Sequence, residues 1–196
     1  YGDARVAALD SAALARRRAV LSQQIELTFP LLVEDVVLMG RYPHYRGQPS
    51  PRDTEIVSEA LAEVDMVGRR LQPYPTLSGG ERQKTHLARV LAQIWEGGEE
   101  RVLFLDEPTT SLDIHYQLHL LDTARKFLGR GVTIVASLHD LNMAFDYGDR
   151  FFLLDSGRLV HEAETARAIP TDLIERVYRV KAAVGDSAGR FLRFRL

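Results

Sequence analysis

The sequence predicts an α/β fold, in which a parallel β-sheet forms the core and a stretch of helices is inserted into it. From Arg101 onward, short apolar stretches of strand length alternate with amphipathic stretches of helix length. From Val33 to about Trp95, apolar residues recur at helical spacing instead. A predicted strand also ends in the pair Asp106-Glu107, and α/β proteins bind ligands at such strand ends.

The C-terminal half carries the strand and helix alternation. Its strand-length stretches are rich in β-branched and aromatic residues, which favour strands. Strands joined by crossover helices run parallel in one sheet. The predicted strands cover residues 102–105, 132–136 and 151–154, and the predicted helices cover residues 113–128 and 140–147.

Shorter elements are expected at the two ends of the chain. Residues 18–22 read as a buried strand that runs into the polar pair Gln23-Gln24. After residue 154, Ser156-Gly157 predicts a turn. A short strand, a helix and a half-exposed final strand are then expected over residues 158–161, 170–180 and 191–196.

The helical stretch divides at its prolines. Pro43, Pro49 and Pro51 interrupt the chain, and we expect a new helix to begin at Asp53. A further helix follows Gly80. The residues that each helix should bury are Val33, Val36, Val37 and Gly40, then Ile56, Val57, Ala60, Leu61 and Val64, and finally Leu87, Val90, Leu91 and Ile94.

Length and composition exclude several classes of protein. With 196 residues the chain can bury a substantial core, and its net charge of -2 gives no basic surface for nucleic acid. It has no cysteine, so a disulfide framework and a thiolate metal site are both excluded. It also has no apolar run long enough to span a bilayer, so any role at a membrane would come through a partner.

Two motifs carry the chemistry. Residues 77–83 read Leu-Ser-Gly-Gly-Glu-Arg-Gln, where a glycine pair opens an amphipathic helix and offers free N–H groups to a phosphate. Residues 101–108 read Arg-Val-Leu-Phe-Leu-Asp-Glu-Pro, an apolar strand that ends in two carboxylates. One carboxylate can hold a metal ion, and the other can accept a proton from water. In this order and spacing, the two motifs resemble the signature and Walker B motifs of ABC-type ATPases.

The resemblance implies a role for each residue at the strand ends. Asp106 would hold Mg²⁺ and Glu107 would polarise the water that attacks ATP. His139 ends the next predicted strand, so it should emerge at the same sheet edge as Asp106 and correspond to the switch histidine that contacts the γ-phosphate. Gln23 corresponds to the Q-loop glutamine that ligates Mg²⁺, although Gln24 could take this place, and Ser22 stands where the family usually has proline.

The signature would serve another subunit's nucleotide. In ABC ATPases two domains pack head to tail, and each signature covers the γ-phosphate bound by the opposite subunit. The resemblance therefore implies a homodimer in which one subunit's residues complete its partner's ATP site. The signature residues are Ser78, Gly79, Gly80 and Gln83, and the D-loop residues at the same interface are Ser111 and Asp113.

The phosphate-binding loop of this family, G-x-x-x-x-G-K-[ST], does not occur in the 196 residues, where none of the three lysines follows a glycine. We expect a preceding β-rich portion to carry this Walker A motif, and these 196 residues alone to be inactive. By resemblance, residues 1–27 are a core remnant with the Q-loop, residues 28–96 a helical signature subdomain, and residues 97–196 the Walker B and switch core.

Further sequence kinship points to one group of importers. Residues 36–44 resemble ATPases of iron-chelate, cobalamin and hemin importers, and residues 86–100 are most similar to those for hemin. Such a subunit would bind ATP and Mg²⁺ at the cytoplasmic face of the bacterial inner membrane. It would contact a transmembrane permease dimer, with residues 39–46 as the expected contact, and a periplasmic binding protein would act indirectly. The alternatives are a ferric siderophore or cobalamin importer, and a non-catalytic module that only completes a partner's site.

Overall fold

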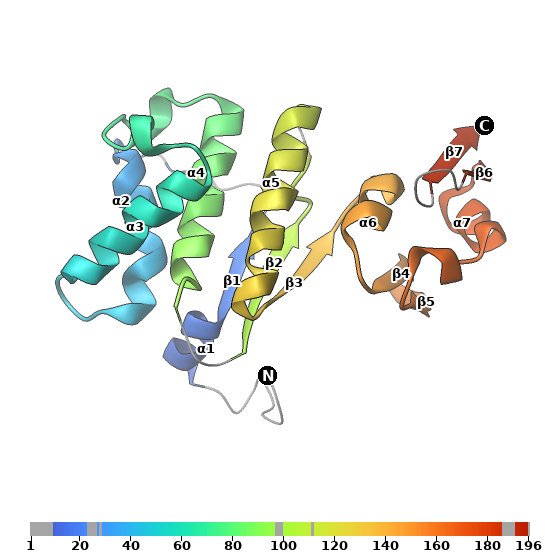
Figure 1. Ribbon diagram of the computed structural model, residues 1–196, viewed down its shortest axis with the longest axis horizontal. Coiled ribbons are helices and arrows are strands. Elements are labelled where there is room, and N and C mark those ends of the chain that lie inside the picture. Colours follow the sequence, from blue (N-terminus) through green and yellow to red (C-terminus); the bar gives the residue numbers. More distant parts are fainter. Residues whose placement is uncertain are drawn as a thin grey trace. The chain divides into compact units, whose positions relative to one another are not determined.

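The computed structural model describes residues 10–22, 27, 29–96, 100–110, 112–185 and 191–195. The chain divides into two compact units, Tyr1–Ser137 and Leu138–Leu196. The first unit contains the parallel sheet together with the longer helices α3, α4 and α5 (Figure 1). The second unit contains two small antiparallel sheets and two short helices among its described residues.

A three-stranded parallel sheet forms the centre of the first unit, as the sequence predicts. Its strands are β1 (Arg18–Leu21), β2 (Arg101–Asp106) and β3 (Val132–Ser137), in the order β1-β2-β3. Because the strands are parallel, their carboxyl ends share one edge. Asp106 is in register with Ser137 at this edge.

The two faces of this sheet differ in burial. Side chains alternate between the faces of a strand, and Leu21, Leu103 and Leu105 are buried on one of them. Val20 and Val135, which face the other way, are 40% and 47% exposed. One face of the sheet therefore packs into the core, while the other stays open in the described part of the chain.

Helices α2 (Val33–Leu38), α3 (Pro51–Glu63) and α4 (Gly79–Gln93) pack on one another beside the sheet, and short helical turns connect them. The turns are η2 (Met39–His44), η3 (Val67–Arg69) and η4 (Tyr74–Thr76). The faces predicted from helical spacing are buried: Val33, Val36, Val37, Gly40, Ile56, Val57, Ala60, Leu61, Val64, Leu87, Val90, Leu91 and Ile94.

The start of α3 differs from the prediction. Pro51 is the first residue of the helix rather than a break before it, because a proline lacks only the N–H that the first helical turn leaves unpaired anyway. Ser50 caps the helix by accepting the Asp53 N–H. Helix α1 (Ser11–Arg17) is not predicted at all, since its residues bury no side chain and so give no helical period.

Helix α5 (Ile114–Lys126) begins after its cap, Asp113, close to the predicted boundary. The turn η5 (Leu128–Arg130) follows it and ends at Gly131, whose φ of +75° suits a glycine. Phe127 is fully buried between these elements, with its ring edge-on to Trp95.

The second unit is built from hairpins and short helices. Its elements are α6 (Leu141–Tyr147), β4 (Phe151–Asp155), β5 (Arg158–Ala163), η6 (Ala166–Ala168), α7 (Thr171–Tyr178), β6 (Lys181–Gly185) and β7 (Phe191–Arg195). Strand β4 pairs antiparallel with β5 and not in the parallel sheet, contrary to the prediction. The predicted turn at Ser156-Gly157 explains this, because both residues have positive φ and so close a tight hairpin.

Strand β6 was not predicted, although it pairs with the final strand, β7. A small core holds the unit together, centred on Ala163, Ile169, Ile174 and Leu192. The Asn142 side chain joins α6 to β7 by accepting the Leu192 N–H at 2.7 Å and donating to the Leu192 carbonyl at 3.2 Å. Among the described helices, none has the length and apolarity needed to cross a bilayer.

Candidate functional site

The two predicted carboxylates stand at the carboxyl end of β2. Asp106 is the last residue of the strand and is exposed, and Glu107 follows it half-buried. Glu107 has a φ of +47°, a left-handed conformation that few residues other than glycine adopt. This conformation turns the chain out of the strand directly after Asp106. Strained backbone of this kind concentrates at functional sites.

Ser137 holds this corner together from the neighbouring strand. Its hydroxyl accepts the backbone N–H of Glu107 at 2.8 Å and donates to Asp106 Oδ1 at 3.1 Å. One side chain thereby fixes both the backbone of the predicted base and the carboxylate of the predicted metal ligand. The prediction missed Ser137, although its place at the end of β3 opposite Asp106 could have revealed it.

The segment after Glu107 is folded back toward α5. The Thr110 N–H bonds the Glu107 carbonyl at 3.2 Å. Gln117, on the first turn of α5, donates to the carbonyls of Thr109 at 3.0 Å and Leu112 at 2.9 Å. Asp113 caps the same helix by accepting the Tyr116 N–H at 3.0 Å. The predicted D-loop residue Asp113 thus follows a segment whose carbonyls are hydrogen-bonded to α5. Gln117 makes these hydrogen bonds, and no sequence pattern identifies it.

The start of α4 presents the predicted signature. Ser78 is exposed and caps the helix, and its hydroxyl and backbone N–H both bond Glu81 at 2.9 Å. These hydrogen bonds from Ser78 lower the pKa of Glu81 and keep its carboxylate ionised. The first N–H groups of any helix have no partner within it, so those of Gly79 and Gly80 face outward.

The two glycines have different surroundings. A Cβ on Gly80 would lie 3.5 Å from the Tyr116 ring, whereas one on Gly79 would meet nothing within 4 Å. Packing within the described chain therefore gives no reason for a glycine at 79. Gln83 lines a small pocket between α4 and α5 with Lys84, whose ammonium stands 4.9 Å from the centre of the Tyr116 ring.

The remaining predicted residues are not brought to this site by what the structure describes. His139 is exposed, directly precedes the α6 cap Asp140, and belongs to the second unit, so its approach to Asp106 stays a prediction. Gln23 and Ser111 lie outside the described residues. Within the described ranges, no three His, Asp or Glu side chains gather into a metal site.

The strand-end carboxylates and the helix-start glycines can be compared with known families. The model of the family "ABC transporter" matches residues 3–110, which is more than half of the chain. The chain belongs to the ABC transporter family. Its match includes the whole of β1, α4 and β2, and therefore both the predicted signature and the predicted Walker B strand.

Curated relatives of this ABC chain include two hemin import ATP-binding proteins HmuV. The protein from Gloeobacter violaceus is 51% identical over 145 residues, which are 73% of this chain and 53% of the relative. The protein from Bradyrhizobium diazoefficiens is 41% identical over 180 residues, or 90% of this chain and 65% of the relative. The chain thus spans about half to two thirds of the length of these relatives.

Solved structures show the same α/β fold of ABC nucleotide-binding domains. A transporter assigned to the metal-chelate ABC type superposes with a TM-score of 0.77 at 22% identity, covering 91% of this chain and 71% of that one. The ATP-binding cassette MJ0796, in a dimer bound to ADP and Pi, gives a TM-score of 0.67 at 26% identity, covering 84% of this chain and 71% of that one.

Proposed function

We propose that this chain belongs to the ATP-hydrolysing subunit of a bacterial ABC importer for hemin. The observation that carries the proposal is the corner at the end of β2, where Ser137 holds both the Asp106 carboxylate and the backbone of Glu107. An exposed carboxylate that can hold a metal ion, next to a second carboxylate that can accept a proton, suits the hydrolysis of a phosphoanhydride by water.

Each carboxylate has its own task in this mechanism. Glu107 accepts a proton from the attacking water, at the point where its left-handed backbone turns the chain out of β2. Asp106 and Gln23 would hold Mg²⁺, which prefers oxygen ligands and keeps several waters and phosphate oxygens. When bound, Mg²⁺ would neutralise charge on the phosphates. His139 would contact the γ-phosphate as the switch histidine.

The start of α4 serves the nucleotide of a second subunit. Gly79 and Gly80, which follow the capping residue Ser78, offer N–H groups at a helix N-terminus, which attracts anions. The open space beside Gly79 supports the approach of a group from outside the chain. The MJ0796 cassette, at 26% identity, is dimeric and carries ADP and Pi. We therefore place Ser78, Gly79, Gly80, Gln83, Ser111 and Asp113 at a homodimer interface.

The glycine-rich loop that binds ATP in this family does not occur in these 196 residues, so the proposal concerns a complete cassette that contains them. A non-catalytic module that only completes a partner's site is the alternative of another class. The strained Glu107 and its brace favour catalysis over this alternative, because backbone strain is retained where function requires it.

The substrate is inferred from kinship with the hemin import proteins, at 41% and 51% identity. The subunit would lie at the cytoplasmic face of the inner membrane against a permease dimer, with a periplasmic binding protein delivering hemin. A ferric siderophore or cobalamin importer is the alternative within the class.

Reconstitution tests the proposal. We expect the complete cassette, in vesicles with the permease and binding protein encoded beside it, to hydrolyse ATP faster when the binding protein carries hemin. Stimulation by a ferric siderophore or by cobalamin, with none by hemin, would show that the substrate is wrongly assigned, while the assignment as an ATPase would stand. An absence of ATP hydrolysis under every condition would favour the non-catalytic module.

A further inference from the structure

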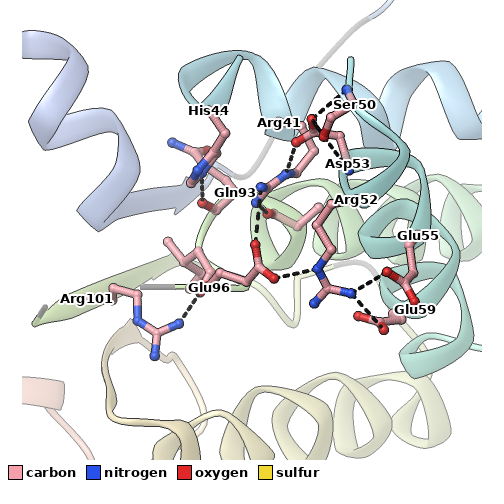
Figure 2. Close-up of polar contacts among 12 residues, drawn as sticks. Arg41, His44, Ser50, Arg52, Asp53, Glu55, Glu59, Gln93, Glu96 and Arg101 are labelled. Carbon is pink, nitrogen blue, oxygen red and sulfur yellow. Dashed lines mark hydrogen bonds and ion pairs between the residues drawn. The ribbon is translucent and has the colours of Figure 1, made fainter. Parts of the chain in front are cut away.

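Three basic side chains bond three successive carbonyls at the C-terminal end of α4 (Figure 2). Arg41 Nη1 donates to the Ala92 carbonyl at 2.8 Å, and His44 Nε2 bonds the Gln93 carbonyl at 2.7 Å. Arg101 Nη1 donates to the Ile94 carbonyl at 2.6 Å. Helices leave their last carbonyls unpaired, so side-chain N–H donors can bond them, and the two arginine cations also complement the helix dipole. We call Arg41, His44 and Arg101 the α4 clamp.

The clamp brings together elements that the proposed function uses separately. Arg41 and His44 lie in η2, within the predicted permease contact. Arg101 is the first residue of β2, the strand that ends at Asp106. Helix α4 itself starts at the signature. The clamp therefore joins the expected permease contact, the signature helix and the strand of the catalytic carboxylates at one point.

Arg41 is built into this point. It is only 3% exposed, and its Nε donates to Asp53 Oδ1 at 2.9 Å. Asp53 is itself held by Ser50, whose hydroxyl and N–H bond Asp53 Oδ2 at 2.6 and 2.9 Å. These partners hold the buried arginine in place, because leaving any of the groups unpaired would cost free energy.

Gly40 brings η2 against the helix. A Cβ at this position would stand 2.0 Å from the backbone carbonyl oxygen of Arg89 and 3.3 Å from the backbone N of Gln93. Only a glycine allows this approach, since backbone atoms of a helix cannot move aside as a side chain can. Gly40, Arg41 and His44 thus fix η2 onto α4 by contact and by hydrogen bonds.

We propose that Gly40, Arg41 and His44 are positioning residues that hold α4 so that its start at Ser78 is correctly placed on the opposite subunit's nucleotide. The inference rests on the proposed function and extends it. A rigid helix carries a displacement from one end to the other, so a shift of η2 would reach Ser78 along α4. Misplacing a catalytic group by about 1 Å can lower a rate on the order of 10²-fold.

Mixed dimers of complete cassettes, purified with two different affinity tags, test this inference. Glu107→Gln in one subunit leaves a single active site, formed by the Glu107 of the other subunit and the signature of the mutated one. Arg41→Met is then placed either in the subunit that supplies this signature or in the subunit that supplies Glu107. We expect turnover to fall at least about tenfold in the first arrangement and to stay within about twofold in the second.

If Arg41 had a purely structural role, Arg41→Met would lower turnover equally in both arrangements, and this result would overturn the inference. A loss of turnover confined to the second arrangement would overturn it as well. Arg52→Met is the matched control. Like Arg41, Arg52 is an arginine that contacts Glu96, but it is exposed and, among the described residues, bonds only side chains, those of Glu55, Glu59 and Glu96. We expect this control to keep turnover in both arrangements.

A second pair of variants covers the case in which Arg41→Met does not fold. His44→Leu removes the donor to the Gln93 carbonyl, whereas His44→Gln keeps an N–H that can reach it. We expect His44→Leu to lower turnover only when it lies in the subunit that supplies the signature, and His44→Gln to restore that turnover. Equal losses of turnover in the two variants would overturn the inference. Dimers in which Glu107→Gln itself leaves hydrolysis unchanged would instead refute the proposed function, before any change at Arg41.

Discussion

The hydroxyl of Ser137 accepts the backbone N–H of Glu107 at 2.8 Å, across the boundary between two parallel strands. The same hydroxyl donates to Asp106 Oδ1 at 3.1 Å. A single oxygen therefore sets the direction in which the chain leaves β2 and the orientation of the carboxylate before it. This link makes Ser137 a positioning residue for the proposed hydrolysis.

Ser137→Ala removes both hydrogen bonds and should lower turnover of the complete cassette by roughly tenfold, because displacing a catalytic group by about 1 Å can lower a rate on the order of 10²-fold. Ser137 is exposed, so water replaces the lost partner and the free energy of unfolding should change little. Ser137→Thr keeps the hydroxyl and should retain activity. Urea unfolding and steady-state ATPase rates measure the two effects, and equal activity of the alanine and threonine variants would contradict this role.

Glu107→Gln keeps the size of the side chain but removes its basicity. Turnover should fall by about 10²–10⁴-fold, as for the loss of a general base, while ATP binding by the complete cassette persists. Rates at saturating ATP and calorimetry of ATP binding separate these quantities. Thr110→Val serves as a control, because the Thr110 hydroxyl stands 3.5 Å from Glu107 Oε2 and should contribute little. Near-normal hydrolysis by Glu107→Gln would remove Glu107 from its role.

Ser78→Arg should block ATP-dependent dimerisation without affecting ATP binding by the same subunit. The arginine would occupy the space at the start of α4 where the opposite subunit's phosphate must dock. Size-exclusion chromatography with ATP on a Glu107→Gln background detects the dimer. Thr54→Arg, at an exposed position on α3, is the control for an added surface arginine and should dimerise normally. Dimers of the Ser78→Arg variant would show that the signature lies elsewhere.

His44 predicts a loss of stability in acid. Burial lowers its pKa below the ordinary 6.5, together with Arg41 and Arg16, and outweighs the opposing effects of the Gln93 carbonyl and Asp53. The unfolded chain therefore takes up the proton first, so the stability from His44 is complete above pH 6.5 and is lost as the pH falls through the folded-state pKa.

His44→Gln should accordingly flatten the fall of the unfolding free energy below pH 6.5, while the wild-type chain and a His115→Gln control, at an exposed position, keep the full slope. Urea titrations at a series of pH values give these slopes. A slope unchanged by His44→Gln would show that other groups cause the acid sensitivity.

The parallel sheet and the buried helix faces follow from the sequence because periodicity reports burial directly. Leu87, Val90 and Leu91 repeat at helical spacing and are buried, as predicted. Strands β4 and β6 show the limit of this reasoning. A short apolar stretch does not reveal with which strand it pairs. The tight turn at Ser156-Gly157 joins β4 to β5 in an antiparallel hairpin, where we expected β4 to join the parallel sheet after a crossover helix.

The site, too, has residues that the sequence predicts and residues that it does not. The Asp106-Glu107 pair and the Ser78-Gly79-Gly80 start of α4 are readable because the chemistry needs those residue types in that order. Ser137 is readable only through the strand pairing that places it opposite Asp106. Gln117 and the α4 clamp are not readable, because they bond backbone carbonyls, which no residue type in the sequence marks. His139 near Asp106 stays a prediction.

The left-handed backbone at Glu107 sets the needs of folding against those of chemistry at one position. Glycine and asparagine adopt a φ of +47° more readily than glutamate, so either would relieve strain at this corner. Neither could accept the proton. Directed evolution of a complete cassette for thermal stability alone, without selection for hydrolysis, should therefore enrich glycine or asparagine at position 107. The resulting proteins should be more stable and should no longer hydrolyse ATP.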